Sequence, residues 1–500
     1  MPHTTFSEGL QASWDNYDRD ARTRVGQCSR GALALIGKYS VALQNAVENL
    51  EESQLFSSLL ENVQHEVTSK GYHKGNISFW NYALRNVLRR SGYYSRIARS
   101  KKPTSKVELR RILSVFDRRH ETVTYMAPME YICLEQAKLR FCTFTIHKFG
   151  KAQLDHIFDV TLNELYFPWA VIDTATLSSY WFIVVKENRP IRSLGNPGID
   201  LRSFGKVDVN YSPFPVLEKA FQRLVLFDWQ PDYSRHKKPE ERPEWQGWLG
   251  VKIPFVIRLS DNLLKVPQRA PIISELETEV YSDPITGGEL DGPAHYINLN
   301  GKETQVLARS IKETDRLIRN IESAQKVWPF LVRALGFQVK GFFSKGLEQL
   351  LWHITVIEAL FGEKVPGMTD RLARRTAAVT GQSETDRIEI KKRFKELYEF
   401  RSRLVHGGEF TDQIWAGHLR EARGMARQSL LWFLNLANKV LAANKEKSLS
   451  AIPSRNELLA LIDLRPDAIT RLAKIIRSEP STFPAIPSWN GSVTRPEKQK

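Results

Sequence analysis

The sequence predicts a multidomain α+β protein with a mixed N-terminal region, a β-rich middle and an all-α helical bundle towards the C-terminal end. Its 500 residues exceed what one hydrophobic core usually organises, so two or three domains are expected. Short runs of β-branched and aromatic residues fill the middle of the chain, and such runs are typical of strands. On both sides of them, apolar residues recur every three or four positions, which is typical of amphipathic helices.

These changes of pattern divide the chain into four regions. Residues 1–119 are expected to form a helical, basic N-terminal region, and residues 120–300 a β-rich mixed domain of unknown role. Residues 301–447 are expected to form a helical domain, followed by a small helical extension and a flexible tail over residues 448–500.

In the N-terminal region the apolar spacing predicts helix over 30–68 and over 76–119, with a break at "SKKPTS". In the middle region a helical piece is expected near "PVLEKAFQRLVLF", and the turn formers of "YSDPITGGELDGPAH" predict a loop. The strand-like runs are "ETVTYMAPMEYICLEQ", "LRFCTFTIHKF", "WAVIDTA", "SYWFIVVKE" and "WLGVKIPFVIRLS".

The helical domain is expected to consist of five consecutive helices. Their approximate limits are 303–325, 344–362, 368–380, 384–406 and 411–444. After them, Ser454 and Glu457 have the spacing of a capping box, which predicts the start of a small helical pair.

The balance of charge favours an anionic partner. Lysine and arginine number 72 against 56 aspartates and glutamates, so the net charge is +16, and basic surface attracts nucleic acid above all. No run approaches the roughly 18 apolar residues that a membrane-spanning helix needs, and no signal-peptide pattern is present, so no membrane partner is expected. The three cysteines form no C-x-x-C pair, which favours a cytoplasmic location.

One helix, expected around 388–406, carries a charge on its apolar stripe, where Phe394, Leu397 and Arg401 follow one another at steps of three and four. A buried guanidinium needs a nearby anion, because burying it unpaired is costly. In "LEQLLWHITVIEALFG", Glu358 interrupts an apolar stripe in the same way, so an ion pair between Glu358 and Arg401 is predicted. The plainer alternative is that this pair only fixes the register of two helices.

His406 lies five positions after Arg401, which separates the two side chains by about 140° on an ideal helix, so they would flank a groove. Ser402 shares the face of His406 and could bond its imidazole. Gly407 and Gly408 predict that the helix stops there, where the helix dipole favours a protonated imidazole. A histidine that exchanges protons near neutral pH beside an arginine suits phosphodiester cleavage, although a helix-capping role is the plainer alternative.

Three segments together resemble the Apea-like branch of the HEPN superfamily: "LWHITVIEALFGEK", "DRLARRTAAVTG" and "FKELYEFRSRLVHGG". The resemblance covers about residues 340–445. The mark of this family is an arginine followed after four to six residues by a histidine near a helix end, usually with a polar residue straight after the arginine. Here Arg401, Ser402 and His406 match that pattern, and Glu358 matches the acidic residue of the family's earlier helix.

The resemblance implies an all-α bundle and, as in catalytic members, a metal-independent endoribonuclease whose arginine and histidine come from two protomers at a dimer cleft. It therefore implies RNA as the partner, a homodimer or higher oligomer, no cofactor, and a role as a toxin or anti-phage defence effector. A regulatory protein partner is a further expectation. Ser402 stands where active members often carry Asn, His or Asp, so the alternative is a non-catalytic HEPN protein that binds RNA or mediates dimerisation.

The basic segment from Arg85 to Arg119 is a second candidate region, because it holds twelve lysines or arginines against two acids. Its tyrosines could stack on unpaired bases and its cations could contact phosphates. The residues expected to bind RNA are Arg85, Arg89, Tyr93, Tyr94, Arg96, Arg99, Lys101 and Lys102. The alternatives are a solvated basic face, a surface for an acidic protein, or a DNA-binding regulator. No histidine pair has a metal-ligand spacing, so no metal site is expected.

Overall fold

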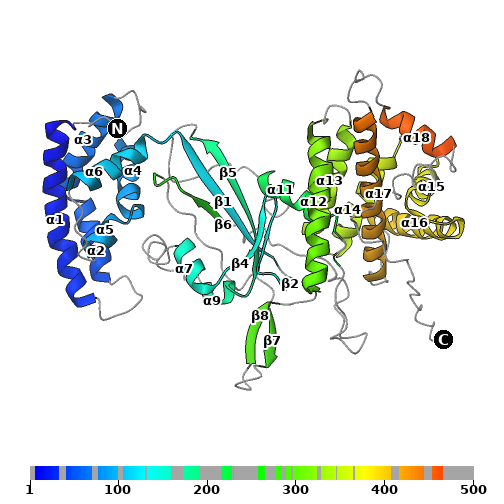
Figure 1. The fold of residues 1–500 in the computed structure, drawn as a ribbon, viewed down its shortest axis with the longest axis horizontal. Coiled ribbons are helices and arrows are strands. Elements are labelled where there is room, and N and C mark those ends of the chain that lie inside the picture. The colour runs from blue at the N-terminus through cyan, green and yellow to red at the C-terminus, as the bar shows by residue number, and fades with distance from the viewer. Residues whose placement is uncertain are drawn as a thin grey trace. The chain divides into compact units, whose positions relative to one another are not determined.

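The chain is mostly helical with a small antiparallel sheet, so the predicted mixed α+β class is confirmed (Figure 1). None of its described helices is long and apolar enough to cross a membrane. The structure, a computed structural model, describes residues 6–32, 41–69, 77–98, 105–129, 132–158, 173–191, 215–227, 229, 257–264, 278–282, 289–293, 297–323, 328–344, 346–363, 366–406, 416–443 and 453–464.

The chain divides into two compact units, each built from separate stretches of sequence. The first unit comprises Met1–Pro128, Lys148–Val207 and Pro254–Glu275. The second unit comprises Met129–His147, Asp208–Ile253 and Leu276–Lys500. Residues 120–300, which the sequence predicts to form one domain, therefore contribute to both units.

The N-terminal part of the first unit is helical and has one hydrophobic core, which includes Trp14, Tyr17, Phe56 and Trp80. The single helix expected over 30–68 is wrong. Ser53 divides it, because its hydroxyl accepts the backbone N–H of Phe56 at 3.2 Å and so caps a new helix. The helices are α1 (Glu8–Ala32), α2 (Val41–Glu51), α3 (Gln54–Ser69), α4 (Ile77–Arg90), α5 (Tyr93–Ala98) and α6 (Ser105–Phe116).

The helix expected over 76–119 is divided into α4, α5 and α6. Gly92 has a φ of 72°, which lets the chain turn between α4 and α5 at a position where a side chain would be strained. Most of the predicted break "SKKPTS" lies outside the described residues. The first helix, α1, begins well before the first predicted helix. Its buried Leu10, Trp14 and Ala21 have helical spacing but are separated by many charged residues.

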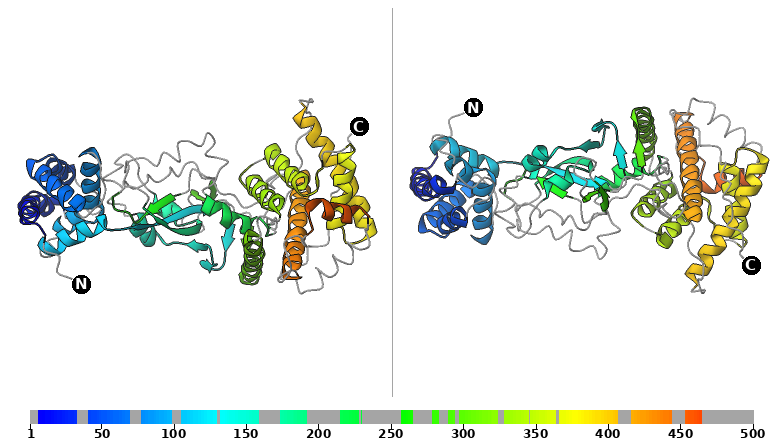
Figure 2. Two further views of the ribbon diagram at one scale, coloured as in Figure 1. Left: turned by 90° about the horizontal axis from the view of Figure 1, so that it is seen from above. Right: turned by 90° about the horizontal axis from the view of Figure 1, so that it is seen from below.

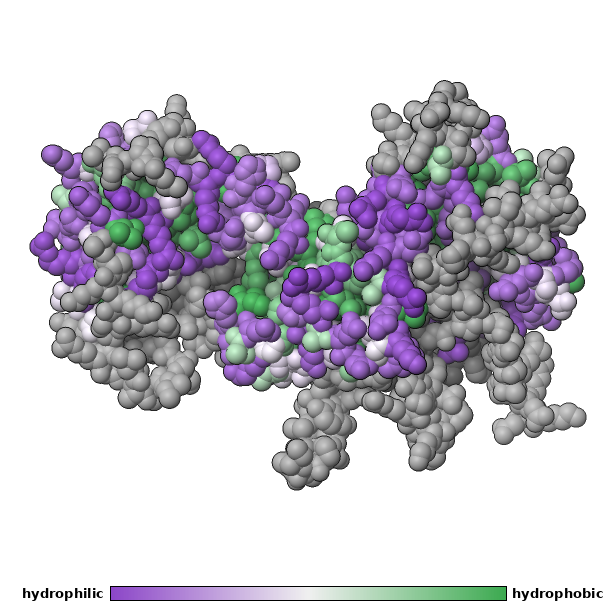
Figure 3. Space-filling view, viewed as in Figure 1, coloured by the Kyte–Doolittle hydropathy of each residue, from purple (hydrophilic) through white to green (hydrophobic). Residues whose placement is uncertain are grey.

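The first unit also contains three neighbouring strands in the order β5-β1-β6, namely β1 (His120–Met129), β5 (Trp181–Pro190) and β6 (Ile257–Ser260). Strands β1 and β6 are antiparallel, with Val123 opposite Ser260. In the face drawn in Figure 3, hydrophobic residues gather over the strands, whereas hydrophilic residues cover most of the helical surface. Two short helices, α7 (Lys151–Phe158) and α9 (Thr174–Leu177), belong to the same unit.

The strand predicted at "WAVIDTA" falls mainly outside the described residues, and its end is wrong. Asp173 caps helix α9, because its carboxylate accepts the backbone N–H groups of Ala175 and Thr176, each at 3.0 Å. An aspartate with helical residues after it is a stronger local signal than the β-branched residues that precede it.

Among its described residues, the second unit has three short pairs of strands. Strand β2 (Ile132–Leu134) pairs in parallel with β9 (Ile297–Leu299), and β3 (Lys138–Arg140) pairs antiparallel with the part of β4 (Thr145–Lys148) up to His147. Strands β7 (Thr278–Ser282) and β8 (Glu289–Pro293) form an antiparallel hairpin. The prediction of a loop at "YSDPITGGELDGPAH" is therefore wrong over β8, which finds its partner immediately before the turn formers.

Most of the second unit is helical, and α17 lies in the middle of these helices, beside α12, α13, α14 and α15 (Figure 2). The sequence predicts five of the longer helices but misses α13, whose apolar residues leave little polar face to mark a period. The helices are α11 (Pro215–Leu224), α12 (Gly301–Ser323), α13 (Pro329–Phe343), α14 (Gly346–Phe361), α15 (Met368–Thr380), α16 (Glu384–Val405), α17 (Ala416–Ala443) and α18 (Arg455–Leu464).

The capping box predicted before α18 is confirmed. The backbone N–H of Ser454 donates to the Glu457 carboxylate at 2.6 Å, and the Glu457 N–H donates to the Ser454 hydroxyl at 3.3 Å. The second helix of the expected pair falls outside the described residues.

Helices α13 and α14 approach closely at Gly341. A Cβ at this position would lie 2.9 Å from Cε1 of His353, whose side chain is fully buried. The Nδ1 atom of His353 lies 3.3 Å from the side-chain oxygen of Gln338. Glycine at 341 therefore makes room for a buried imidazole, and this contact fixes the side of α14 that faces α13.

Candidate functional site

The ion pair predicted between Glu358 of α14 and Arg401 of α16 is confirmed. A terminal nitrogen of Arg401 lies 3.6 Å from Glu358 Oε1. The side chain of Glu358 is 21% exposed and that of Arg401 is 25% exposed, so the pair lies at the edge of the helix packing. The apolar neighbours on both stripes, Ile354 and Leu397, are buried. The helical stripes therefore position the two charges against each other.

Tyr398 completes this arrangement, although it was not among the residues predicted from the sequence. Its hydroxyl donates to Glu358 Oε1 at 3.0 Å, and the Arg401 guanidinium carbon lies 5.8 Å from the centre of its ring. Burial, followed by the negative charge of Glu358, raises the pKa of Tyr398 to about 12, so the hydroxyl stays protonated and donates. Tyr398 precedes Arg401 by three positions, and this shared-face spacing is the signal that could have revealed it.

His406 lies directly after α16, which ends at Val405, and its imidazole is exposed. Its backbone N–H donates to the Ser402 carbonyl at 3.1 Å and closes the last helical turn. The hydrogen bond predicted between the Ser402 and His406 side chains is absent among the described residues, so this prediction is wrong. Gly407 and Gly408 lie outside the described part of the chain. An exposed imidazole at a helix end is open to a substrate.

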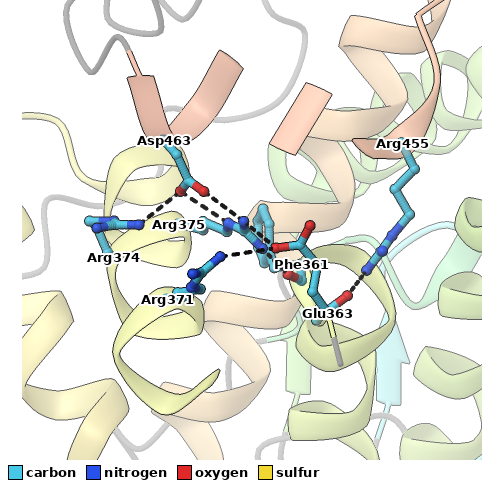
Figure 4. Close-up of polar contacts among 8 residues, drawn as sticks. Phe361, Glu363, Arg371, Arg374, Arg375, Arg455 and Asp463 are labelled. Carbon is cyan, nitrogen blue, oxygen red and sulfur yellow. Dashed lines mark hydrogen bonds and ion pairs between the residues drawn. The ribbon is translucent and has the colours of Figure 1, made fainter. Parts of the chain in front are cut away.

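A larger polar cluster lies around Arg375 of α15, whose side chain is only 1% exposed (Figure 4). Its guanidinium donates to both oxygens of Asp463 on α18, at 3.1 and 2.7 Å, and to the Glu363 carboxylate at 2.6 Å. A fourth bond, of 2.6 Å, runs to the backbone carbonyl of Phe361 at the end of α14. Arg375 thus joins three helices through one side chain.

Three more arginines surround this cluster (Figure 4). Arg374 pairs with Asp463 at 3.1 Å and Arg371 with Glu363 at 3.7 Å, while Arg455 donates to the backbone carbonyl of Gly362 at 2.5 Å. Arg371, Arg374 and Arg375 all belong to the segment "DRLARRTAAVTG", which begins near the start of α15. Their observed role is to attach α15 and α18 to the end of α14.

The prediction that two tyrosines of the N-terminal basic segment are exposed and stack on RNA bases is wrong. Tyr93 and Tyr94 are each 1% exposed, so they are not available to stack on bases in this conformation. The Tyr93 hydroxyl donates to Asp18 at 2.8 Å, and the Tyr94 hydroxyl is 2.6 Å from that of Tyr17. These aromatic rings serve the core between α1, α3 and α5.

Three predicted phosphate contacts are also turned inward, so their prediction as a free basic surface is wrong. Arg89 donates to both carboxylate oxygens of the buried Glu51, and Arg85 donates to the Glu51 carbonyl at 3.0 Å. Arg96 pairs with Glu108 at 2.6 Å. Glu51 and Glu108 come from other helices of the same core and offset the positive charge of these arginines. The other predicted contacts, Arg99, Lys101 and Lys102, lie outside the described residues.

The described residues contain no group of three or more His, Cys, Asp or Glu side chains that could hold a metal ion. Comparison with protein-family models, with curated proteins and with solved structures gave no match to the chain. The structure thus brings Glu358, Tyr398 and Arg401 together, whereas His406 lies exposed at the end of the same helix, with its backbone bonded to Ser402.

Proposed function

We propose that the chain is a metal-independent endoribonuclease of the HEPN type, with an all-α HEPN-like bundle and a site formed by Arg401 and His406. The observation that carries this proposal is the ion pair of Arg401 with Glu358 on a helix that ends at an exposed His406. The apolar stripes of the two helices predict the ion pair, and the resemblance supports roles for Arg401 and His406 in catalysis.

The proposed reaction uses the 2′-OH of the RNA as its own nucleophile. The 2′-oxygen bonds to the neighbouring phosphorus and loses its proton, while the bond from phosphorus to the 5′-oxygen breaks and that oxygen gains a proton. His406 serves as the general acid or base in this exchange. Arg401 offsets the negative charge that builds on the phosphoryl oxygens. The products are a 2′,3′-cyclic phosphate and a 5′-hydroxyl.

Glu358 and Tyr398 are positioning residues in this proposal. Glu358 attracts the guanidinium of Arg401, and Tyr398 holds the Glu358 carboxylate by a hydrogen bond of 3.0 Å. Their combined effect is to restrict where Arg401 can place its donors. Ser402 is expected to act on the same face as His406, towards the substrate.

The proposal includes an assembly and a biological role. The family resemblance supports a homodimer, in which the arginine and histidine of two protomers line one cleft, and a cytoplasmic toxin or anti-phage defence effector. It also supports a regulatory protein partner that controls cleavage.

The test is incubation of the full-length protein with total cellular RNA in EDTA. His406→Ala and Arg401→Ala are expected to lower the cleavage rate by about 100-fold or more, because each removes a group needed in the transition state. Arg403→Ala is the matched control, since Arg403 is exposed on the same helix and should leave the rate unchanged. Circular dichroism checks that each variant is folded. Full activity of both site variants would overturn the catalytic proposal.

The second candidate function is a non-catalytic HEPN protein that binds RNA or mediates dimerisation. Ser402, in place of the Asn, His or Asp common in active members, favours it. Purified protein would then shift RNA on a gel and leave its length unchanged. The DNA-binding alternative has lost support, because Arg85, Arg89 and Arg96 are engaged in internal ion pairs.

A further inference from the structure

Four side chains, three on α16 and one directly after it, form a row along one face of the helix. Lys391, Lys395, Ser402 and His406 follow one another at steps of four, seven and four residues. With 100° per residue, all four lie within about 60° of one another around the helix axis. With a rise of 1.5 Å per residue, the row is about 22 Å long. It ends at the proposed catalytic histidine.

The two lysines share one acid on the neighbouring helix. The Nζ atoms of Lys391 and Lys395 lie 3.3 and 2.7 Å from the same oxygen of Asp370 on α15. Side-chain hydrogen bonds from Lys395 and Lys391 lower the pKa of Asp370, so its carboxylate is charged at neutral pH. Two ammonium groups against one carboxylate leave a net positive charge at this place.

These three groups are open to solvent. The side chains of Lys391, Lys395 and Asp370 are 40%, 41% and 49% exposed. An exposed ion pair is weak, so an incoming phosphate can replace Asp370 as the partner of either ammonium at little cost. This distinguishes the lysines from Arg89 and Arg96, whose partners Glu51 and Glu108 are buried.

The two ends of the row therefore differ in chemistry. Its basic end can hold backbone phosphates, and its other end carries the hydroxyl of Ser402 and the imidazole of His406. Two exposed acids border the row. Glu399 lies about 40° from Lys395 and about 20° from His406, and Glu384 lies one heptad before Lys391, about 20° from it, and pairs with Arg387 at 3.3 Å.

We propose that this row, with Lys391 and Lys395 as the phosphate contacts, binds the backbone of a single-stranded RNA substrate and leads it to His406. The inference rests on the proposed endoribonuclease function and specifies the substrate class and its path. Contacts to phosphate carry no sequence information, so this binding is expected to be independent of base sequence.

The test measures binding of a fluorescent, unstructured single-stranded RNA by anisotropy, in EDTA and at several salt concentrations. All proteins are full-length and carry His406→Ala, so that the RNA stays intact. Adding Lys391→Gln and Lys395→Gln is expected to weaken binding roughly ten- to thirty-fold at about 0.1 M salt. The slope of log K against log salt should become shallower by about 1.4, since each lost phosphate contact removes about 0.7.

The matched control removes two charges elsewhere in the second unit. Lys302 and Lys312 of α12 are both exposed, so Lys302→Gln with Lys312→Gln tests whether net charge alone explains the loss. The control is expected to change the affinity by less than about threefold. Asp370→Asn is expected to have the opposite effect on RNA affinity. It removes the carboxylate that competes with phosphate for the two lysines, so RNA binding should become tighter.

The outcomes separate this inference from the proposed function. If the double variants of α16 and α12 weaken RNA binding equally, the proposal that the row binds RNA is overturned. A preference of the protein for duplex DNA over single-stranded RNA would overturn it as well. If His406→Ala abolishes cleavage while the α16 lysine variants bind RNA normally, the proposed function holds and the row fails. If the wild type does not cleave RNA but the lysine variants weaken RNA binding as predicted, the catalytic proposal is overturned and the proposed binding row is supported. A variant with only Lys391→Gln covers the case in which the double variant fails to fold.

Discussion

Glu358 and Arg401 illustrate what a single charged residue on an apolar stripe implies. Each interrupts a run of buried aliphatic and aromatic side chains, and each meets the other across a helix interface. An ion pair of this exposure contributes only about 0–1 kcal/mol to stability. Its main effect is to orient the guanidinium, which is why Tyr398 and Glu358 matter for the site more than for the fold.

His353 is a buried histidine with a different role. Burial, followed by the positive charge of Arg423, lowers the pKa of His353 to about 3. Below its ordinary pKa of about 6.5, the unfolded chain takes up a proton that the folded chain refuses. The stability due to the neutral imidazole is therefore complete above about pH 6.5 and decreases as the pH falls towards 3.

The resulting prediction concerns stability against acid. Between about pH 7 and about pH 5 the free energy of unfolding of the wild type should fall by about 1–2 kcal/mol on account of His353. Urea unfolding followed by circular dichroism at several pH values measures this. In His353→Gln, which cannot titrate in this range, the dependence should be flatter by that amount. The same slope in both proteins would contradict the assignment.

At the scale of helices, the fate of the N-terminal arginines depends on which helix lies opposite. The charges of α4 and α5 meet Glu51 from α2 and Glu108 from α6. Glu51 lies outside the basic segment, 38 positions before Arg89, and Glu108 lies within it, 12 positions after Arg96, and each acid is buried. A local count of twelve basic residues against two acids therefore overestimates the charge that reaches the surface.

Helix α18 is attached by the arginine cluster of Figure 4, and a substitution there should loosen it. Asp463→Ala leaves the buried Arg375 with fewer acceptors and is expected to lower the free energy of unfolding by about 1–3 kcal/mol. Arg374→Ala removes a partner of Asp463 that is 49% exposed, so its effect should stay below about 1 kcal/mol. Chemical unfolding measures both, and equal losses would contradict the special position of Arg375.

Asp463 also connects this cluster to pH. Burial on its own would raise the pKa of Asp463, but the hydrogen bonds and charges of Arg375 and Arg374 outweigh it, and the pKa is lowered. A lowered carboxyl pKa contributes stability above the ordinary range near pH 4 and loses it as the pH falls further. The attachment of α18 therefore weakens only in strong acid.

At the scale of the whole molecule, the proposed function predicts an oligomer. If the site needs two protomers, light scattering should give twice the mass of one chain, and the specific cleavage activity should fall on dilution. A monomer with constant specific activity at all concentrations would contradict the shared cleft. Arg401→Ala and His406→Ala serve as inactive references in the same assay.

The sequence predicts the order of helical and strand-rich regions well, because both periods are visible in it. It fails at α13 and at β8. Helix α13 is so apolar that no polar face marks its period, and β8 becomes a strand only because β7 pairs with it. The candidate site was also predicted only in part. The ion pair of Glu358 and Arg401 follows from helical spacing, whereas the contact of Tyr398 with Glu358 was not predicted.

The sequence by itself determined the mixed α+β class, the capping box before α18, and the meeting of Glu358 with Arg401. The class follows from the two periods of apolar residues, the capping box from local hydrogen bonds, and the ion pair from one charged position on the apolar stripe of each of two helices. Only the tertiary structure decided that Tyr93 and Tyr94 are core residues, that Arg375 joins three helices, and that Lys391 and Lys395 share Asp370. The physical reason is that the effect of a charge depends on the groups that surround it in space, and those groups come from distant parts of the chain.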